Sequence, residues 1–308
     1  MDQRLPLRIG TRGSPLALTQ ANMVADALRA AHGWDEGACA IVPIRTSGDR
    51  IQDRPLAEVG GKALWTKELD RALDGHEIDV AVHSMKDVET IRPQTIAIAA
   101  MLPRADVRDR LIGAASVAEL PAGARVGTSS PRRAAQLRRR RPDLVPVLFR
   151  GNVATRLAKL DLGEADATLL AAAGLDRLGR RDIGHAVPIE TMLPAPAQGA
   201  VGIEHLAART DLAALLAAID DAATHACVTA ERALLAALGA DCRSPVAALA
   251  RLEGEAIHLR AEILSEDGAL SEAGEARFAP GDARAPAALA AQLLGRAAPP
   301  LRALFQGP

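Results

Sequence analysis

The sequence predicts an α/β fold of two similar domains around a cleft, followed by a smaller α+β domain. A chain of 308 residues is too long for one small core, so two or three domains are expected. Strand-like and helix-like segments alternate through the first two hundred residues, as they do in layered α/β proteins. From about Asp220 the pattern changes to one amphipathic helix followed by alternating strands.

The elements of the two α/β halves are predicted from short apolar runs and helix punctuation. The clearest helix opens at Ser14-Pro15 and ends near His32-Gly33, because Ser favours the N-cap, Pro the first helical position and Gly the position past the end. Strands are expected at 7–10, 40–44, 78–82, 125–127, 144–149 and 167–171. Further helices are expected at 64–73, from Ser130-Pro131 onward and at 153–162.

The C-terminal part is predicted to be a separate α+β domain. It begins with an amphipathic helix at 225–238, continues with strands at 246–252 and 256–264, and closes with a helix at 283–294. Cys242 falls in its first loop. The predicted domains are 1–102 with 200–219, 103–199, and 220–308, with hinge segments near 103–105 and in the Pro- and Gly-rich stretch 194–199.

One short motif occurs twice. Gly10-Thr11-Arg12-Gly13-Ser14-Pro15 is similar to Gly127-Thr128-Ser129-Ser130-Pro131, and each copy leaves a strand and enters a helix. The N-terminus of a helix presents backbone N–H groups and a positive dipole end, which together bind anions. Helix capping alone would explain either copy. Two copies beside Arg12 and the Arg132-Arg133 pair favour anion binding.

Composition narrows the classes of function. The net charge of −1 argues against a general binder of polyanions. An apolar run of 18 residues and a charged-apolar leader are both lacking, so we expect a cytoplasmic protein that contacts no membrane. Three cysteines without a C-x-x-C spacing predict reduced thiols and no metal site. The run Arg138–Arg141 favours a solvated helix end over a nucleic-acid site, because no aromatic platform accompanies it.

The segment 78–87 is a candidate reaction centre. It is an apolar run that ends on His83-Ser84-Met85-Lys86-Asp87, and ligands of α/β proteins bind at the carboxyl ends of strands. A solvated ion pair at a strand exit is the alternative. If the strand continued to residue 87, Lys86 and Asp87 would point to opposite faces.

Arginines at the ends of predicted elements indicate a ligand with several negative groups. Arg is suited to bidentate recognition of carboxylates and phosphates, and the pattern does not distinguish the two. Neither G-x-x-x-x-G-K-[ST] nor G-x-G-x-x-G occurs, so no motif supports nucleotide binding. These arginines are Arg12, Arg132, Arg133, Arg150, Arg156 and Arg177.

Six motifs, in order along nearly the whole chain, resemble the porphobilinogen deaminase (hydroxymethylbilane synthase) family. They are specific together, although none is decisive alone. The motifs are Thr11-Arg12-Gly13-Ser14-Pro15-Leu16-Ala17-Leu18, Val59-Gly60-Gly61-Lys62, Val82-His83-Ser84-Met85-Lys86-Asp87-Val88, Gly127-Thr128-Ser129-Ser130-Pro131-Arg132-Arg133, Arg150-Gly151-Asn152-Val153 and Gln198-Gly199-Ala200-Val201-Gly202-Ile203-Glu204.

The resemblance implies a transferase of tetrapyrrole (haem and chlorophyll) biosynthesis with two α/β domains like those of periplasmic binding proteins. Such enzymes join four porphobilinogen molecules head to tail into hydroxymethylbilane and release four ammonia. The chain grows on a dipyrromethane cofactor, which a thioether would attach to Cys242. Porphobilinogen carries an acetate and a propionate, which explains the many arginines and capped helix ends.

The resemblance also implies a role for individual residues. Asp87 would be catalytic, stabilising the cationic azafulvene that forms when ammonia leaves and helping to move protons. The implied cofactor-binding residues are Cys242, Lys86, Thr128, Ser129, Ser130, Arg132, Arg133, Arg150 and Gly174. The implied substrate-binding residues are Arg12, Ser14, Lys62, Trp65, Arg156, Arg177 and Gln198. The only expected partner is porphobilinogen, bound by a monomer without metal or nucleic acid.

The chain departs from the usual family pattern at four positions near these residues. Asp241 precedes Cys242 where Gly or Ser is usual, and its charge is expected to disfavour the thiolate. The other three are Trp65 for Phe, Glu89 for Pro and Pro131 for Leu. Two alternative functions remain at this point, a solute-binding or effector-binding module and a nucleic-acid protein. Cys242 in a third domain argues against the first, because a simple binder does not need it.

Overall fold

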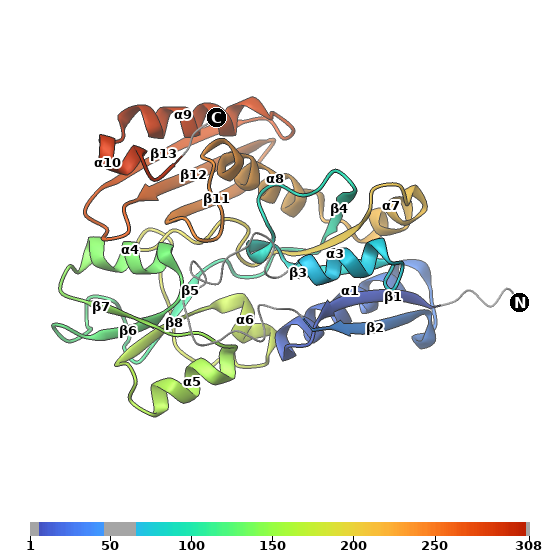
Figure 1. Ribbon diagram of the computed structural model, residues 1–308, viewed down its shortest axis with the longest axis horizontal. Helices are drawn as coiled ribbons and strands as arrows, with labels where there is room; N and C mark the ends of the chain where they lie inside the picture. The colour runs from blue at the N-terminus through green and yellow to red at the C-terminus, as the bar shows by residue number, and fades with distance from the viewer. Residues whose placement is uncertain (1–5, 46–65, 306–308) are drawn as a thin grey trace, which may run out of the picture. The chain divides into compact units, whose positions relative to one another are not determined.

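The computed structural model describes residues 6–45 and 66–305 and contains two five-stranded mixed sheets and one three-stranded antiparallel sheet (Figure 1). Contacts group these residues into two compact units. Unit one comprises residues 6–45, 66–105 and 200–225. Unit two comprises residues 106–199 and 226–305 and contains two of the three sheets. The domain boundaries drawn from the sequence remain a prediction.

The sheet of unit one has the strand order β2-β1-β3-β10-β4. Strand β1 runs parallel to β2 and β3, whereas β10 is antiparallel to both β3 and β4. The strands are β1 (Leu7–Arg12), β2 (Cys39–Ile44), β3 (Val80–Ser84), β4 (Ile96–Met101) and β10 (Val201–Leu206). The helices are α1 (Pro15–His32), α3 (Lys67–Asp74) and α7 (Thr210–Leu216), with 3₁₀ turns at η1 (Glu36–Ala38), η2 (Met85–Asp87) and η3 (Ala217–Ile219).

Helices α1 and α3 contribute to two separate cores of this sheet. Because successive strand residues point to opposite faces, Val80 and Val82 of β3 join the core formed with α1. Ala81, between them, joins the core formed with α3. Both cores are aliphatic, as a chain whose aromatic content is 2% requires.

The first sheet of unit two repeats the same topology, with the order β7-β6-β8-β5-β9. Again three parallel strands are followed by two strands that are antiparallel to their neighbours. The strands are β5 (Asp109–Ile112), β6 (Arg125–Thr128), β7 (Val145–Leu148), β8 (Ala167–Ala171) and β9 (His185–Ala186). The helices are α4 (Pro131–Arg140), α5 (Val153–Asp161) and α6 (Ala172–Arg177). Strands β1 and β6 therefore correspond, which confirms that the repeated motif marks two similar halves.

The C-terminal part of unit two is a three-stranded antiparallel sheet packed against helices, as predicted. Its largest core joins α8 and α9 to the sheet through aliphatic side chains and Phe278. The strands are β11 (Val246–Glu253), β12 (Ala256–Leu264) and β13 (Ser271–Phe278). The helices are α8 (Ala222–Ala237), whose first four residues belong to unit one, α9 (Arg284–Arg296) and α10 (Pro299–Arg302). Taken singly, no helix in the described ranges is long and apolar enough to cross a membrane, and Thr210–Ile219 with Ala222–Ala237 reaches that length only as a pair bent by 114°.

The arginine run 138–141 lies at the end of α4 as expected, with Arg139 and Arg140 exposed and Arg138 and Arg141 half-buried. Arg139 pairs with Glu262 on β12, and Arg138 donates to the Glu266 carbonyl at 3.2 Å. Arg140 donates to the Glu190 carbonyl at 2.8 Å, and Arg141 pairs with an aspartate two residues further on. These side chains therefore help to hold α4 in place within unit two.

Most predicted elements are present with boundaries shifted by a few residues, but β4, β5, β9, β10 and β13 were not predicted as strands. Strand β13 carries charged or small residues at alternate positions, and β5 has charged residues at two of its four positions. Their pairing in the sheet outweighs this weak local preference. The predicted helix at 64–73 begins at Lys67, and its first positions partly lie outside the described residues.

Gly127 shows how close packing positions the end of a strand. A Cβ atom at Gly127 would overlap the ring of Phe149, which is 1% exposed. Because Gly127 has no side chain, Phe149 can pack directly on β6. Phe149 and Arg150 follow the last residue of β7. A Cβ atom at Gly10, the matching position of β1, would likewise overlap the side chain of Ile78.

We expect Gly127→Ala to lower the free energy of unfolding by about 1–3 kcal/mol, because the added methyl group overpacks a buried site. Gly295→Ala is the matched control, since nothing lies within 4 Å of its Cβ position in α9. Helix propensity should make that change stabilising by up to about 1 kcal/mol. Urea unfolding measures both, and equal effects of the two substitutions would contradict the steric explanation.

Candidate active site

Four of the predicted site residues lie at one edge of the sheet in unit one. Strands β1 and β3 are parallel, so Arg12, the last residue of β1, is at the same edge as Lys86 and Asp87, which follow β3. Ser14 caps α1 by accepting a hydrogen bond from the backbone of Ala17 at 3.3 Å. This is the edge at which ligands of α/β proteins bind.

The side chains of Lys86 and Asp87 lie on a 3₁₀ turn instead of a continued strand. Strand β3 ends at Ser84, and residues 85–87 form η2. The strand does not continue to residue 87, so the condition for placing Lys86 and Asp87 on opposite faces of a strand is not met. The turn is held by Met85, whose backbone donates to Ala200 at 3.1 Å. Both Lys86 and Asp87 are half-buried.

A hydrogen bond joins this turn to the first helix. The Gln20 side-chain amide, 2% exposed on α1, donates to the Ser84 hydroxyl at 2.8 Å. Helix α1 therefore fixes the last residue of β3, which precedes the Lys86-Asp87 turn. The arrangement places a helix N-terminus, a cation and a carboxylate at one sheet edge.

Unit two has an equivalent turn after β6, formed by Thr128, Ser129 and Ser130. The Ser130 backbone donates to the Thr128 hydroxyl at 3.1 Å, and the Ser130 hydroxyl caps α4 by accepting from the Arg133 backbone at 3.4 Å. Ser129 accepts a hydrogen bond from Arg156 on α5 at 3.2 Å. Three residues of the predicted site thus meet at this turn.

Arg150 and Arg156 are brought to the same edge by the turn after β7. Arg150 is 6% exposed, and Gly151 adopts a φ of 108°, a conformation that favours glycine. Asn152 then caps α5 by accepting from the Thr155 backbone at 3.0 Å. Arg156 folds back and donates from its Nε to the Gly151 carbonyl at 3.0 Å.

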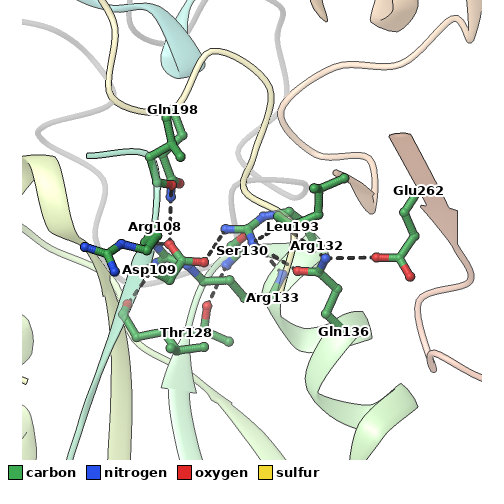
Figure 2. Close-up of polar contacts among 12 residues, drawn as sticks. Arg108, Asp109, Thr128, Ser130, Arg132, Arg133, Gln136, Leu193, Gln198 and Glu262 are labelled. Carbon is green, nitrogen blue, oxygen red and sulfur yellow. Dashed lines mark hydrogen bonds and ion pairs between the residues drawn. The ribbon is translucent and has the colours of Figure 1, made fainter. Parts of the chain in front are cut away.

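A fully buried carboxylate, Asp109, organises the two central arginines (Figure 2). Arg132 donates to Asp109 Oδ2 at 2.8 Å and Arg133 donates to Oδ1 at 2.7 Å. Gln198 points toward the same carboxylate and donates to Oδ1 at 2.9 Å. Burial opposes ionisation of Asp109, but the two guanidinium groups outweigh it and hold the pKa of Asp109 well below its ordinary value of 3.8.

Some of the remaining donors of the two arginines are used within the protein. Arg132 donates to Gln136 and to the Leu193 carbonyl, both at 3.0 Å, and Arg133 donates to the Leu169 carbonyl at 2.8 Å. In both side chains the buried Nε–H group has no acceptor among the described residues. A buried donor without an acceptor is costly, so these two groups suit a bound anion such as a pyrrole carboxylate.

Gly174, Arg177 and Gln198 are also gathered in unit two. Gly174 is buried in α6, directly after β8. Arg177 ends the same helix and donates to the Gly199 carbonyl at 2.8 Å, and burial lowers its pKa. Gln198 donates to the Val107 carbonyl at 2.7 Å as well as to Asp109.

Cys242 is exposed in a turn between α8 and β11. Its neighbours form a local ion pair, in which Arg243 donates to Asp241 Oδ2 at 2.6 Å. The Asp241 carboxylate beside Cys242 is therefore paired with Arg243. Cys227 is buried and Cys39 is half-buried, which leaves Cys242 as the accessible thiol of the three.

Two predicted substrate-binding residues, Lys62 and Trp65, lie outside the described residues. The sequence reasoning missed Asp109, which stands between Arg108 and Arg110 and reads as part of a surface charge run. The alternation of Val107, Asp109 and Leu111 was the available signal, because side chains two residues apart share one face of a strand. Leu111 is fully buried, and so is Asp109.

Asp109→Asn should lower the free energy of unfolding by about 3–5 kcal/mol at pH 7, because it leaves two buried arginines without their counter-charge. The pKa of Asp109 is lower in the folded than in the unfolded chain, so its stabilising effect is complete above the unfolded value. The difference between parent and variant should narrow by about 1.4 kcal/mol per pH unit below about pH 3.8. Asp26→Asn is the control, because Asp26 belongs to an exposed ion pair on α1. A difference independent of pH would contradict the ionised Asp109.

Two family models and several curated proteins match this chain. The family model "Porphobilinogen deaminase, dipyromethane cofactor binding domain" matches residues 7–214, and "Porphobilinogen deaminase, C-terminal domain" matches residues 225–295. A porphobilinogen deaminase of Sphingopyxis alaskensis is 62% identical over 306 residues, covering 97% of this chain and 96% of its own. One of Paracoccus denitrificans is 53% identical over 300 residues, covering 96% of each.

Among solved structures, the BvgS periplasmic VFT2 domain of Bordetella pertussis is 16% identical with a TM-score of 0.41, covering 69% of this chain and 86% of its own. An ancestral arginine-binding protein bound to arginine is 14% identical with a TM-score of 0.38, covering 70% and 91%. The two family domains occur in order over nearly the whole length, and we conclude that this chain belongs to the porphobilinogen deaminase family.

Proposed function

We propose that this chain joins four porphobilinogen molecules head to tail into hydroxymethylbilane, with release of four ammonia, through the residues described above. The observation that carries the proposal is membership of the porphobilinogen deaminase family over residues 7–214 and 225–295. The two sheet edges supply what such a substrate needs. Each offers a capped helix N-terminus with arginine nearby, and porphobilinogen carries two carboxylates.

Asp87 is the proposed catalytic group. When ammonia leaves porphobilinogen, positive charge develops on the pyrrole, and an adjacent carboxylate stabilises it by Coulomb attraction. The same carboxylate can act as a base that accepts a proton when the new bond forms and as an acid that returns it. Asp87 is half-buried on η2, where solvent screening of its charge is reduced. Lys86, on the same turn, is proposed to bind a carboxylate.

The dipyrromethane cofactor is proposed to be attached to Cys242 through a thioether. Arg132 and Arg133 fit this group, because each has a buried Nε–H donor without an acceptor among the described residues. The other proposed cofactor-binding residues are Lys86, Thr128, Ser129, Ser130, Arg150 and Gly174. When bound, the cofactor supplies the pyrrole to which the first porphobilinogen unit is joined. The proposed substrate-binding residues are Arg12, Ser14, Lys62, Trp65, Arg156, Arg177 and Gln198.

We further propose a cytoplasmic monomer that binds neither nucleic acid nor membrane. The net charge of −1 and the cysteine content support this proposal. Arg138 and Arg139 contact residues of the C-terminal domain within unit two. These contacts also support the proposal that the chain does not bind nucleic acid, because the two side chains already have partners. We also propose the three-domain division predicted from the sequence, with boundaries at 102–103, 199–200 and 219–220.

Asp87→Asn should preserve the fold and lower kcat by about 100-fold or more, because an amide cannot balance developing positive charge. Activity is measured as porphobilinogen consumed per mole of cofactor-loaded enzyme. Asp26→Asn, exposed on α1, serves as the control and should retain activity. Near-normal turnover by a folded, loaded Asp87→Asn protein would remove Asp87 from the catalytic role.

Cys242→Ser should yield protein without covalent cofactor. The intact mass should equal that of the sequence, whereas the parent should be heavier by one dipyrromethane. The variant should not colour with the acidic aldehyde reagent for dipyrromethanes and should be inactive. Cys227→Ser and Cys39→Ser are matched controls that should keep the added mass. Loss of the mass in Cys227→Ser with retention in Cys242→Ser would overturn the attachment site.

A further inference from the structure

Asp87 lies in the segment 84–91, and the residues directly before and after this segment both contact one buried carboxylate. Glu204 on β10 is fully buried, and His83, directly before the segment, has its Nε2 3.1 Å from Glu204 Oε2, close enough for an ion pair but out of line for a hydrogen bond. Arg92, directly after the segment, donates from Nε to Glu204 Oε1 at 2.8 Å and from Nη2 to Oε2 at 2.9 Å. The eight residues between these anchors include Lys86 and Asp87.

Arg92 uses all five of its N–H donors. Besides the two bonds to Glu204, it donates to Glu89 at 2.8 Å, to Asp70 at 2.5 Å and to the Thr66 hydroxyl at 3.3 Å. The Thr66 hydroxyl in turn donates to Glu89 at 2.7 Å. These contacts tie residues 89–92 to α3 through Asp70 and to β10 through Glu204. A planar guanidinium group is the side chain that can bridge several carboxylates in this way.

The middle of the segment is fixed on the same strand. Met85 donates its backbone N–H to Ala200, and a Cβ atom at Gly202 would overlap the Met85 sulfur. Strand β10 therefore contacts the segment before, within and after the turn. Burial opposes ionisation of Glu204, but His83 and Arg92 outweigh it and lower the pKa of Glu204 to about 2, so this anchor is charged at neutral pH.

Glu89 stands where the family pattern usually has Pro. Proline restricts its own φ and the preceding residue, whereas glutamate does not. In this chain Glu89 instead pairs with Arg92. Val88, the preceding residue, has φ −85° and ψ 135°, which is the extended conformation that a following proline requires. The ion-pair network thus holds the backbone in the shape that a proline would favour.

We propose that Arg92 is a positioning residue for Asp87, acting through Glu204 and Glu89. This inference rests on the catalytic role proposed for Asp87. Arg92 does not touch substrate in the proposal; it fixes the turn from which Asp87 reaches the reacting pyrrole. Its loss should therefore affect the rate of the chemical step more than the binding of porphobilinogen.

Arg92→Lys is the test, because lysine keeps the charge beside Glu204 but cannot bridge the three carboxylates. We expect kcat per cofactor-loaded enzyme to fall by about 10- to 100-fold, as for a small misplacement of a catalytic group, with KM changed by less than about twofold. Arg8→Lys is the matched control. Arg8 makes a bidentate pair with Asp79 at the opposite edge of the same sheet, so its kcat should equal that of the parent.

A second variant separates positioning from general loss of stability. Adding Glu89→Pro to Arg92→Lys should recover about fivefold or more of the lost kcat, because proline restores the backbone restraint without the ion pairs. A merely structural role would lower the melting temperature and leave kcat of the folded fraction unchanged.

The outcomes distinguish this inference from the proposed function. If Arg92→Lys keeps kcat within twofold of the parent while Asp87→Asn abolishes turnover, Asp87 remains catalytic and the positioning role is overturned. If KM rises with kcat unchanged, Arg92 serves binding and the proposal is equally overturned. If Glu89→Pro added to Arg92→Lys recovers no activity, the network does not act through the backbone of the segment and the proposal is overturned.

Discussion

The buried ion triad of Asp109, Arg132 and Arg133 is the interaction on which the site in unit two depends. Two adjacent guanidinium groups, 3% and 5% exposed, repel one another and lose their hydration, and one carboxylate with three hydrogen bonds offsets both costs. The arginines are thereby held in fixed directions before a ligand arrives. Preorganised charge of this kind binds anionic groups without reorganisation of the protein.

The two halves apply the same physical solution in equivalent strands. In each five-stranded sheet, the first antiparallel strand beside the three parallel ones carries a buried carboxylate bound to arginine. In unit one this is Glu204 of β10, and in unit two it is Asp109 of β5. Glu204 restrains the turn that bears Asp87, whereas Asp109 restrains arginines proposed to hold the cofactor. The two buried carboxylates therefore occupy equivalent strands but restrain different groups.

The C-terminal domain is tied to the second sheet by polar as well as apolar contacts. Gln136 on α4 donates both to the Leu193 carbonyl and to Glu262 on β12, at 3.1 and 2.9 Å. Glu231, fully buried on α8, accepts from the backbones of Ala197 and Ala250 at 2.5 and 2.7 Å. Ala197 has a positive φ of 61°, so this carboxylate stabilises a strained residue in the stretch predicted from the sequence as a hinge.

Local chemistry let the sequence determine the helix caps, the repeated turns and the exposed cysteine. Ser14, Ser130 and Asn152 cap helices by accepting hydrogen bonds from backbone groups three residues away. Cys242 is exposed in the loop in which the neighbouring sequence predicted it. The family motifs likewise rest on short stretches of residues. The strand order, by contrast, brings Arg92 to a glutamate 112 positions away and Arg132 to an aspartate 23 positions away. Only the tertiary structure could decide those partners, because the strength of a buried ion pair depends on distance and dielectric surroundings that no local pattern specifies.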